Sequence, residues 1–141
     1  MATLTKRLAL VVDDDPDLQS AMCARLVQMD FEVVAALHYE AAVLHLSVRR
    51  PHLVCIDVGL PTQSGYELCE HIRGPLGLLG VPILMTCDSE LPEDMANAEM
   101  AGANAFLKKP FSMHELGAYV EALVNPSRAR EAQVLRLLAW P

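Results

Sequence analysis

The sequence predicts an α/β fold in which a parallel sheet is covered by helices on both faces. Short apolar runs alternate five times with segments of helical character, which is the pattern of strands joined by crossover helices. The runs are continuously apolar, as expected for strands that are buried on both faces. No internal repeat or low-complexity tract interrupts the alternation across the 141 residues, so we expect one domain with one core.

The first third of the chain predicts a strand, a helix and a second strand. Arg7–Val12 is a continuous, partly β-branched apolar run, which favours a buried strand. Asp15 then supplies an N-cap and Pro16 the first helical position. Apolar residues follow at helical spacing down to about Met29, so this helix has one apolar stripe. Phe31–Leu37 is the second predicted strand.

The middle of the chain predicts a helix, a strand and another helix. The helix is Tyr39–Val48, and a basic pair followed by Pro51 ends it. Leu53–Asp57 is the third buried strand, and its last residue is acidic. A loop marked by proline and glycine, VGLPTQSG, leads into a third helix over Gly65–Arg73.

The last third predicts two strands, each followed by a helix. Val81–Met85 is the fourth strand, and Glu93–Ala101 is a short helix that Gly102 caps. Ala105–Lys108 is the short fifth strand. Ser112 opens the final helix with a Ser-x-x-Glu capping box.

The chain divides into a domain over residues 1–125 and a C-terminal linker or short helix over residues 126–141. The Asn125-Pro126 pair breaks the last helix, and Ser127 is a suitable cap for a new one. The segment is rich in apolar residues near its end. We expect a linker to an output domain, or alternatively a dimerising or self-packing helix.

Composition excludes several classes of protein. The formal charge of -7 argues against direct binding to nucleic acid or an anionic membrane, because both need a basic surface. No apolar run approaches the roughly 18 residues of a membrane span, and the N-terminus lacks a secretory pattern, so a soluble cytoplasmic protein is expected. Four cysteines without a CxxC spacing and five scattered histidines argue against a disulfide framework or a zinc site.

Polar residues gather where the predicted strands end. Asp13 and Asp14 follow the first strand, Asp57 ends the third, Thr86 follows the fourth and Lys109 follows the fifth. Ligands of such sheets bind at the carboxyl ends of the strands, so these side chains should converge on one rim. A carboxylate cluster suits Mg²⁺, and beside a cation one carboxylate oxygen can attack a phosphoryl group.

The ordered motifs VVDDDP, VCIDVGLPTQSGYEL, PILMTCD and GANAFLKKPF resemble those of the receiver domain of two-component response regulators. The resemblance spans about residues 7–124. It implies a flavodoxin-like, doubly wound sheet with strand order 2-1-3-4-5, an order for which chemotaxis receivers are a known example.

The resemblance also implies a role for each residue of the cluster. Asp57 would be the phosphoacceptor, and Asp14 a direct Mg²⁺ ligand together with the carbonyl of Gly59. Asp13 would contact the ion through water, and Thr86 would be the hydroxyl that moves toward the phosphoryl group. Lys109, followed by a cis bond at Pro110, would pair with the phosphoryl group, and Phe106 would be a switching aromatic residue. Cys87 follows Thr86 where the family usually has alanine, which suggests narrower access for the phosphodonor.

The function implied is phosphorelay signalling rather than enzymatic turnover, with only self-phosphorylation and self-dephosphorylation. The expected partners are a sensor histidine kinase or a histidine phosphotransfer protein. An output domain or partner protein would contact the face formed by helix four, strand five and helix five, and a second copy of the chain could form a homodimer. Two alternatives are a Mg²⁺-dependent phosphatase or phosphotransferase with an aspartyl nucleophile, and a pseudo-receiver that signals without phosphate. The first usually has an acid two residues after its nucleophile, where this chain has Gly59.

Overall fold

The computed structural model describes residues 6–89 and 91–125. Within these residues the five strands are β1 (Arg7–Val12), β2 (Phe31–Ala36), β3 (Leu53–Asp57), β4 (Ile83–Cys87) and β5 (Ala105–Lys108). The five helices are α1 (Pro16–Gln28), α2 (Tyr39–Val48), α3 (Gly65–Arg73), α4 (Pro92–Ala101) and α5 (Met113–Val124). The predicted linker or short helix over residues 126–141 lies outside the described residues.

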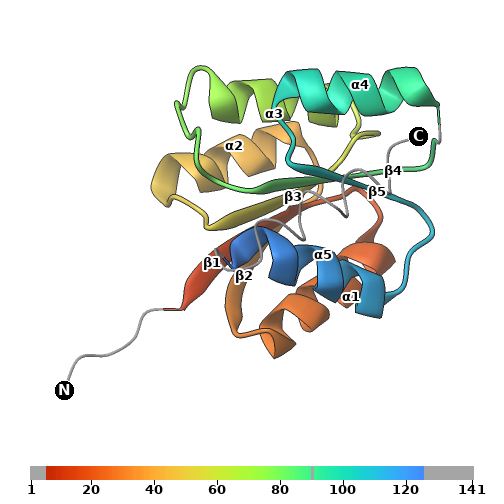
Figure 1. The fold of residues 1–141 in the computed structure, drawn as a ribbon. Helices are drawn as coiled ribbons and strands as arrows, with labels where there is room; N and C mark the ends of the chain where they lie inside the picture. The colour runs from red at the N-terminus through yellow and green to blue at the C-terminus, as the bar shows by residue number, and fades with distance from the viewer. Residues whose placement is uncertain (1–5, 90, 126–141) are drawn as a thin grey trace.

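The strands form one parallel sheet in the order β2-β1-β3-β4-β5 (Figure 1). This confirms the predicted fold class and strand order. Successive strand residues point to opposite faces, so the sheet contributes to two buried clusters. On one face α1 and α5 cover residues such as Val11 and Cys55, and on the other α2, α3 and α4 cover residues such as Leu10 and Ile56.

Capping residues that the sequence indicated stabilise several of the helix termini. Asp15 accepts hydrogen bonds from the amides of Asp17 and Leu18, and Ser112 forms the reciprocal capping box that opens α5. Gly102 ends α4 in the left-handed conformation with φ of 109°. Each cap satisfies backbone groups that the helix itself leaves without partners.

The predicted boundaries of the fourth strand were wrong by two residues, since β4 is Ile83–Cys87 instead of Val81–Met85. Pro82 has no amide hydrogen to donate to a strand ladder, and the carbonyl of Val81 accepts a hydrogen bond from Arg73 at 2.6 Å. Thr86 therefore lies inside the strand, directly opposite Asp57 of β3. Smaller differences are that β2 ends at Ala36 and not Leu37, and that α4 begins one residue early, at Pro92.

Among the described residues no helix is both long enough and apolar enough to cross a membrane. The sheet places the polar residues that follow its strands at one edge. Because all five strands run in the same direction, their carboxyl ends meet at the same edge, where β1, β3, β4 and β5 are neighbours in the order β1-β3-β4-β5.

Candidate functional site

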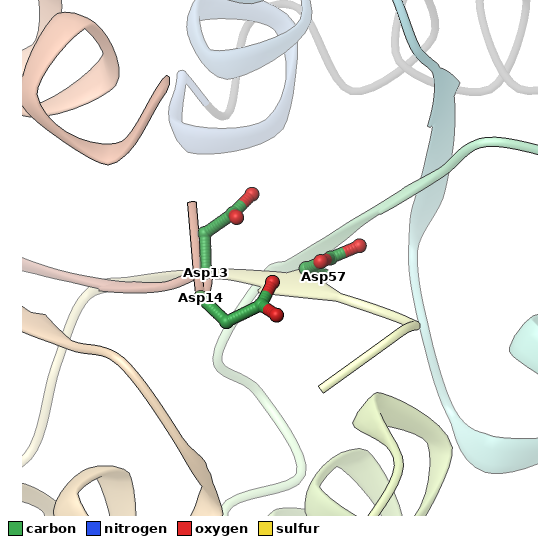
Figure 2. A group of neighbouring side chains, drawn as sticks. All are labelled: Asp13, Asp14 and Asp57. Atoms are coloured by element: carbon green, nitrogen blue, oxygen red, sulfur yellow. The ribbon is translucent and has the colours of Figure 1, made fainter. Parts of the chain in front are cut away.

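Three carboxylates meet at the carboxyl edge of the sheet. Asp13 and Asp14 follow β1, and Asp57 ends β3. Each offers a carboxylate oxygen, and these oxygens lie within 4.8 Å of one another. Figure 2 shows the three side chains as neighbours that come from two separate segments. The predicted convergence of these acids is therefore present in the structure.

The turn after β1 divides the two adjacent acids between interior and solvent. Asp13 is buried and Asp14 is exposed. The amide of Asp13 still donates to the carbonyl of Ala36 at the end of β2, so it continues the sheet, while its Oδ1 accepts a hydrogen bond from the amide of Asp15 at 2.9 Å. Both acids can face one site because the chain turns into α1 at this point.

Lys109 supplies a positive charge to the cluster. Its Nζ lies 3.2 Å from Asp13 Oδ2 and 3.4 Å from Asp57 Oδ1. Burial by itself would lower the pKa of Lys109, but the carboxylates of Asp57 and Asp13 outweigh burial and raise the pKa. Lys109 is thus held as a cation. The peptide bond between Lys109 and Pro110 is cis, as predicted.

The charge of Asp57 is opposed by its surroundings. Burial raises the pKa of its carboxyl, and the negative charge of Asp13 raises it further. Lys109 and a hydrogen bond from the amide of Gly59, 3.3 Å from Asp57 Oδ1, act in the opposite direction. The net effect is a raised pKa, so the ionised form of Asp57 is less favourable here than in water.

Thr86 faces this cluster from β4. Its residue is 1% exposed, it stands opposite Asp57 in the strand pairing, and its Oγ1 has no hydrogen-bond partner in the described part of the chain. Phe106, one strand further, is fully buried against the core on the α4 side. Its predicted role as a switch stays a prediction.

Cys87 is buried at the end of β4, and its Sγ accepts a hydrogen bond from the amide of Ser89 at 3.3 Å. Burial raises the pKa of this thiol, which opposes formation of the reactive thiolate. The geometry therefore gives Cys87 a packing role beside the site.

One residue that contacts the site was missed by sequence reasoning. The side-chain amide of Gln19 on α1 donates hydrogen bonds to the carbonyls of Ala36 and Asp13, at 2.8 and 3.3 Å. The available signal was its spacing, because residue 19 lies one helical turn after the cap Asp15 and hence on the helix face that meets the strand ends.

Comparison with known proteins defines the class of protein. The family model of the response regulator receiver domain matches residues 9–121. The chain therefore belongs to the receiver-domain family of two-component response regulators, which is a family of signalling domains. This confirms the family that the sequence motifs indicated.

Individual relatives agree with this assignment. The phosphate regulon transcriptional regulatory protein PhoB of Escherichia coli strain K12 is 31% identical over 119 residues, which cover 84% of this chain and 52% of PhoB. The chain spans about half the length of the curated relatives it matches. Chemotaxis response regulator CheY4 of Vibrio cholerae is 25% identical with a TM-score of 0.79, covering 84% of this chain and 99% of CheY4. The BeF3-activated receiver domain of DrrB, a Thermotoga maritima protein, is 27% identical with a TM-score of 0.75, covering 85% and 98%.

Proposed function

We propose that this receiver domain accepts a phosphoryl group on Asp57 from a histidine kinase or a histidine phosphotransfer protein. The observation that carries the proposal is that Asp57 pairs with the Lys109 ammonium and stands in the sheet opposite Thr86, whose hydroxyl has no hydrogen-bond partner among the described residues. Lys109 Nζ lies 3.4 Å from the Asp57 carboxylate, and Thr86 is buried. A carboxylate in this setting has a cation and a hydrogen-bond donor ready for the oxygens of an incoming phosphoryl group.

The donor set fits Mg²⁺. It consists of oxygens, which this hard cation prefers, and their charges exceed the single charge of Lys109. In addition, Asp13 Oδ2 is buried beside Lys109 but receives no hydrogen bond of acceptable geometry from the described residues. We assign Asp13, Asp14, Asp57 and the carbonyl of Gly59 as the groups that hold the ion. When bound, Mg²⁺ supplies positive charge that offsets the charge on the transferring phosphoryl oxygens.

In the transfer step a carboxylate oxygen of Asp57 attacks the phosphorus of the phosphohistidine. A P–O bond forms, the P–N bond breaks with its electron pair staying on the imidazole nitrogen, and that nitrogen takes a proton from solvent. Lys109 then pairs with the acyl phosphate, and Thr86 donates its hydroxyl hydrogen to a phosphoryl oxygen. The move of Thr86 toward the phosphoryl group, together with a change at Phe106, shifts the face formed by α4, β5 and α5.

The alternative of a phosphatase or phosphotransferase is less well supported. Such an enzyme needs a general acid beside the nucleophile, and the position two residues after Asp57 is Gly59, which has no side chain. A pseudo-receiver that signals without phosphate is also disfavoured, because the acids, the lysine and the threonine all meet at one edge.

The output of the domain is proposed on the same basis. Relatives such as PhoB are about twice as long as the matched region, so we propose that an output domain or a separate partner protein reads the α4-β5-α5 face.

Incubation with Mg²⁺ and acetyl phosphate followed by intact mass measurement tests the proposal. We expect one labile phosphate adduct in the parent chain and none in Asp57→Asn. Asp30→Asn, which removes an exposed acid just before β2 and so at the opposite edge of the sheet from the site, is the control and should accept phosphate like the parent. An unmodified parent chain, or an adduct that persists in Asp57→Asn, would contradict the proposal.

A further inference from the structure

Gln19 links three elements directly behind the acidic cluster. It lies on α1, and its side-chain Nε2 donates to the carbonyl of Ala36 at the end of β2 at 2.8 Å and to the carbonyl of Asp13 at 3.3 Å. The Ala36 carbonyl also accepts the amide of Asp13 at 3.1 Å. The side-chain amide of Gln19 therefore hydrogen-bonds to the backbone at the carboxyl end of β1.

The carbonyl that Gln19 binds belongs to the peptide group between Asp13 and Asp14. A peptide group is planar, so holding its carbonyl restricts the ψ angle of Asp13 and the φ angle of Asp14, and with them the directions in which both side chains leave the backbone. β1 ends at Val12, and neither acid belongs to a regular element. Holding this peptide plane therefore restricts the relative placement of the buried Asp13 and the exposed Asp14.

We infer that Gln19 is a positioning residue for the cation site. Its amide acts through the backbone of Asp13 and does not touch the ion itself. The inference rests on the proposed function, since it concerns the acids assigned to Mg²⁺. Groups that orient metal ligands typically change metal affinity by roughly 10- to 100-fold when they are removed, and we expect the lower end because the hydrogen bond to Asp13 is long.

A purely structural role makes a different prediction. The carbonyl of Ala36 keeps its hydrogen bond from the amide of Asp13 when Gln19 is replaced, so little is left unsatisfied between β1 and β2. Loss of the Gln19 amide should therefore weaken the ion site more than it weakens the fold. The ratio of the two effects separates a positioning residue from a residue that only joins α1 to the sheet.

The test is a Mg²⁺ titration of the full chain followed by nuclear magnetic resonance at the amide of Gly59, which lies 3.3 Å from Asp57 Oδ1. Gln19→Met keeps the side-chain length and removes the donor. We expect its dissociation constant for Mg²⁺ to rise by about tenfold, with an unfolding curve close to that of the parent. Gln28→Met, an exposed change on the same helix, should leave both unchanged.

A second measurement needs no variant. In the parent chain the side-chain amide resonances of Gln19 should shift during the titration with the same dissociation constant as Gly59, while those of Gln28 stay fixed. Saturable binding by the parent with equal affinity in Gln19→Met, or Gln19 resonances that do not respond, would overturn the inference alone. A parent chain without saturable Mg²⁺ binding would overturn the cation assignment on which the inference rests.

Discussion

Replacing Asp57 with asparagine tests how the acidic cluster is held together before any ion binds. The attraction between Asp57 and Lys109, at 3.4 Å, is about 5 kcal/mol at an effective dielectric near 20. The buried Asp13 lies within 4.8 Å and repels Asp57 by about 3.5 kcal/mol at the same dielectric. Asp14 is exposed, so water reduces its repulsion to about 1 kcal/mol. Attraction and repulsion therefore nearly cancel.

Burial decides the sign of the effect. Removing a carboxylate from water costs free energy that a nearly neutral Coulomb sum cannot offset, and the raised pKa of Asp57 has burial as its main cause. Asparagine removes the charge and keeps the shape. Lys109 still has Asp13 at 3.2 Å, so the cation keeps a partner. We expect Asp57→Asn to raise the free energy of unfolding in metal-free buffer by about 1–2 kcal/mol, well short of the several kcal/mol per buried ion.

Urea unfolding with and without Mg²⁺ provides the assay. Mg²⁺ at about 100 times its dissociation constant stabilises a folded protein by about 2.7 kcal/mol. The parent should gain this free energy of unfolding while Asp57→Asn gains less. In Mg²⁺ the parent should therefore be the more stable of the two, the reverse of the order in metal-free buffer. Asp30→Asn, an exposed change, should follow the parent. A loss of about 3 kcal/mol or more in metal-free Asp57→Asn, the cost of breaking an ordinary buried ion pair, would refute the reasoning.

Three further predictions concern single groups. In metal-free buffer the contribution of Asp57 to stability should be fully present below its ordinary pKa of 3.8 and be lost as the pH rises through the raised pKa, and Asp57→Asn should lack this component of the pH titration. Thr86→Val should raise the free energy of unfolding by about 1 kcal/mol in urea, because the buried hydroxyl has no partner among the described residues; a loss of stability would show that the hydroxyl is already satisfied. Gly102→Ala should lose at least about 1 kcal/mol in thermal unfolding, since φ is 109° and a Cβ would lie 2.6 Å from Arg73 Cγ. Gly80→Ala, with open space at its Cβ, is the control, and equal effects of the two changes would contradict the steric argument.

Local signals explain which parts of the fold were predictable from the sequence. Caps, prolines and a glycine in the left-handed conformation act on their own neighbours, so the ends of α1 and α5 follow from Asp15 and Ser112. The start of β4 does not follow from local signals, because VPILM is apolar throughout. Its ladder begins where distant groups hold it: the side chain of Asn104 accepts the amide of Ile83 at 2.8 Å, and Arg73 holds the carbonyl of Val81.

The same distinction applies to the site. The residue types at the strand ends predicted which acids meet, because parallel strands present their carboxyl ends on one edge. They did not predict that Asp13 is buried against Lys109 while Asp14 faces solvent. That division depends on the turn between β1 and α1 and on the side chain of Gln19, whose partners are backbone carbonyls that carry no sequence signal.

Among the described residues, the site holds two buried oxygen atoms that receive or donate no hydrogen bond. Asp13 Oδ2 and Thr86 Oγ1 are both buried without a hydrogen bond from the described residues, although Asp13 Oδ2 has the charge of Lys109 Nζ at 3.2 Å. A buried group without any partner, such as the Thr86 hydroxyl among the described residues, costs about 1–3 kcal/mol. On the proposed function, a bound cation would satisfy the first and a phosphoryl oxygen on Asp57 the second. A ligand can shift a conformational equilibrium only by its differential affinity for the two states. If Asp57 is phosphorylated as we propose, the free energy released when Thr86 gains a partner would be available to move β4 and the elements beside it, which would connect the chemistry at Asp57 to the α4-β5-α5 face.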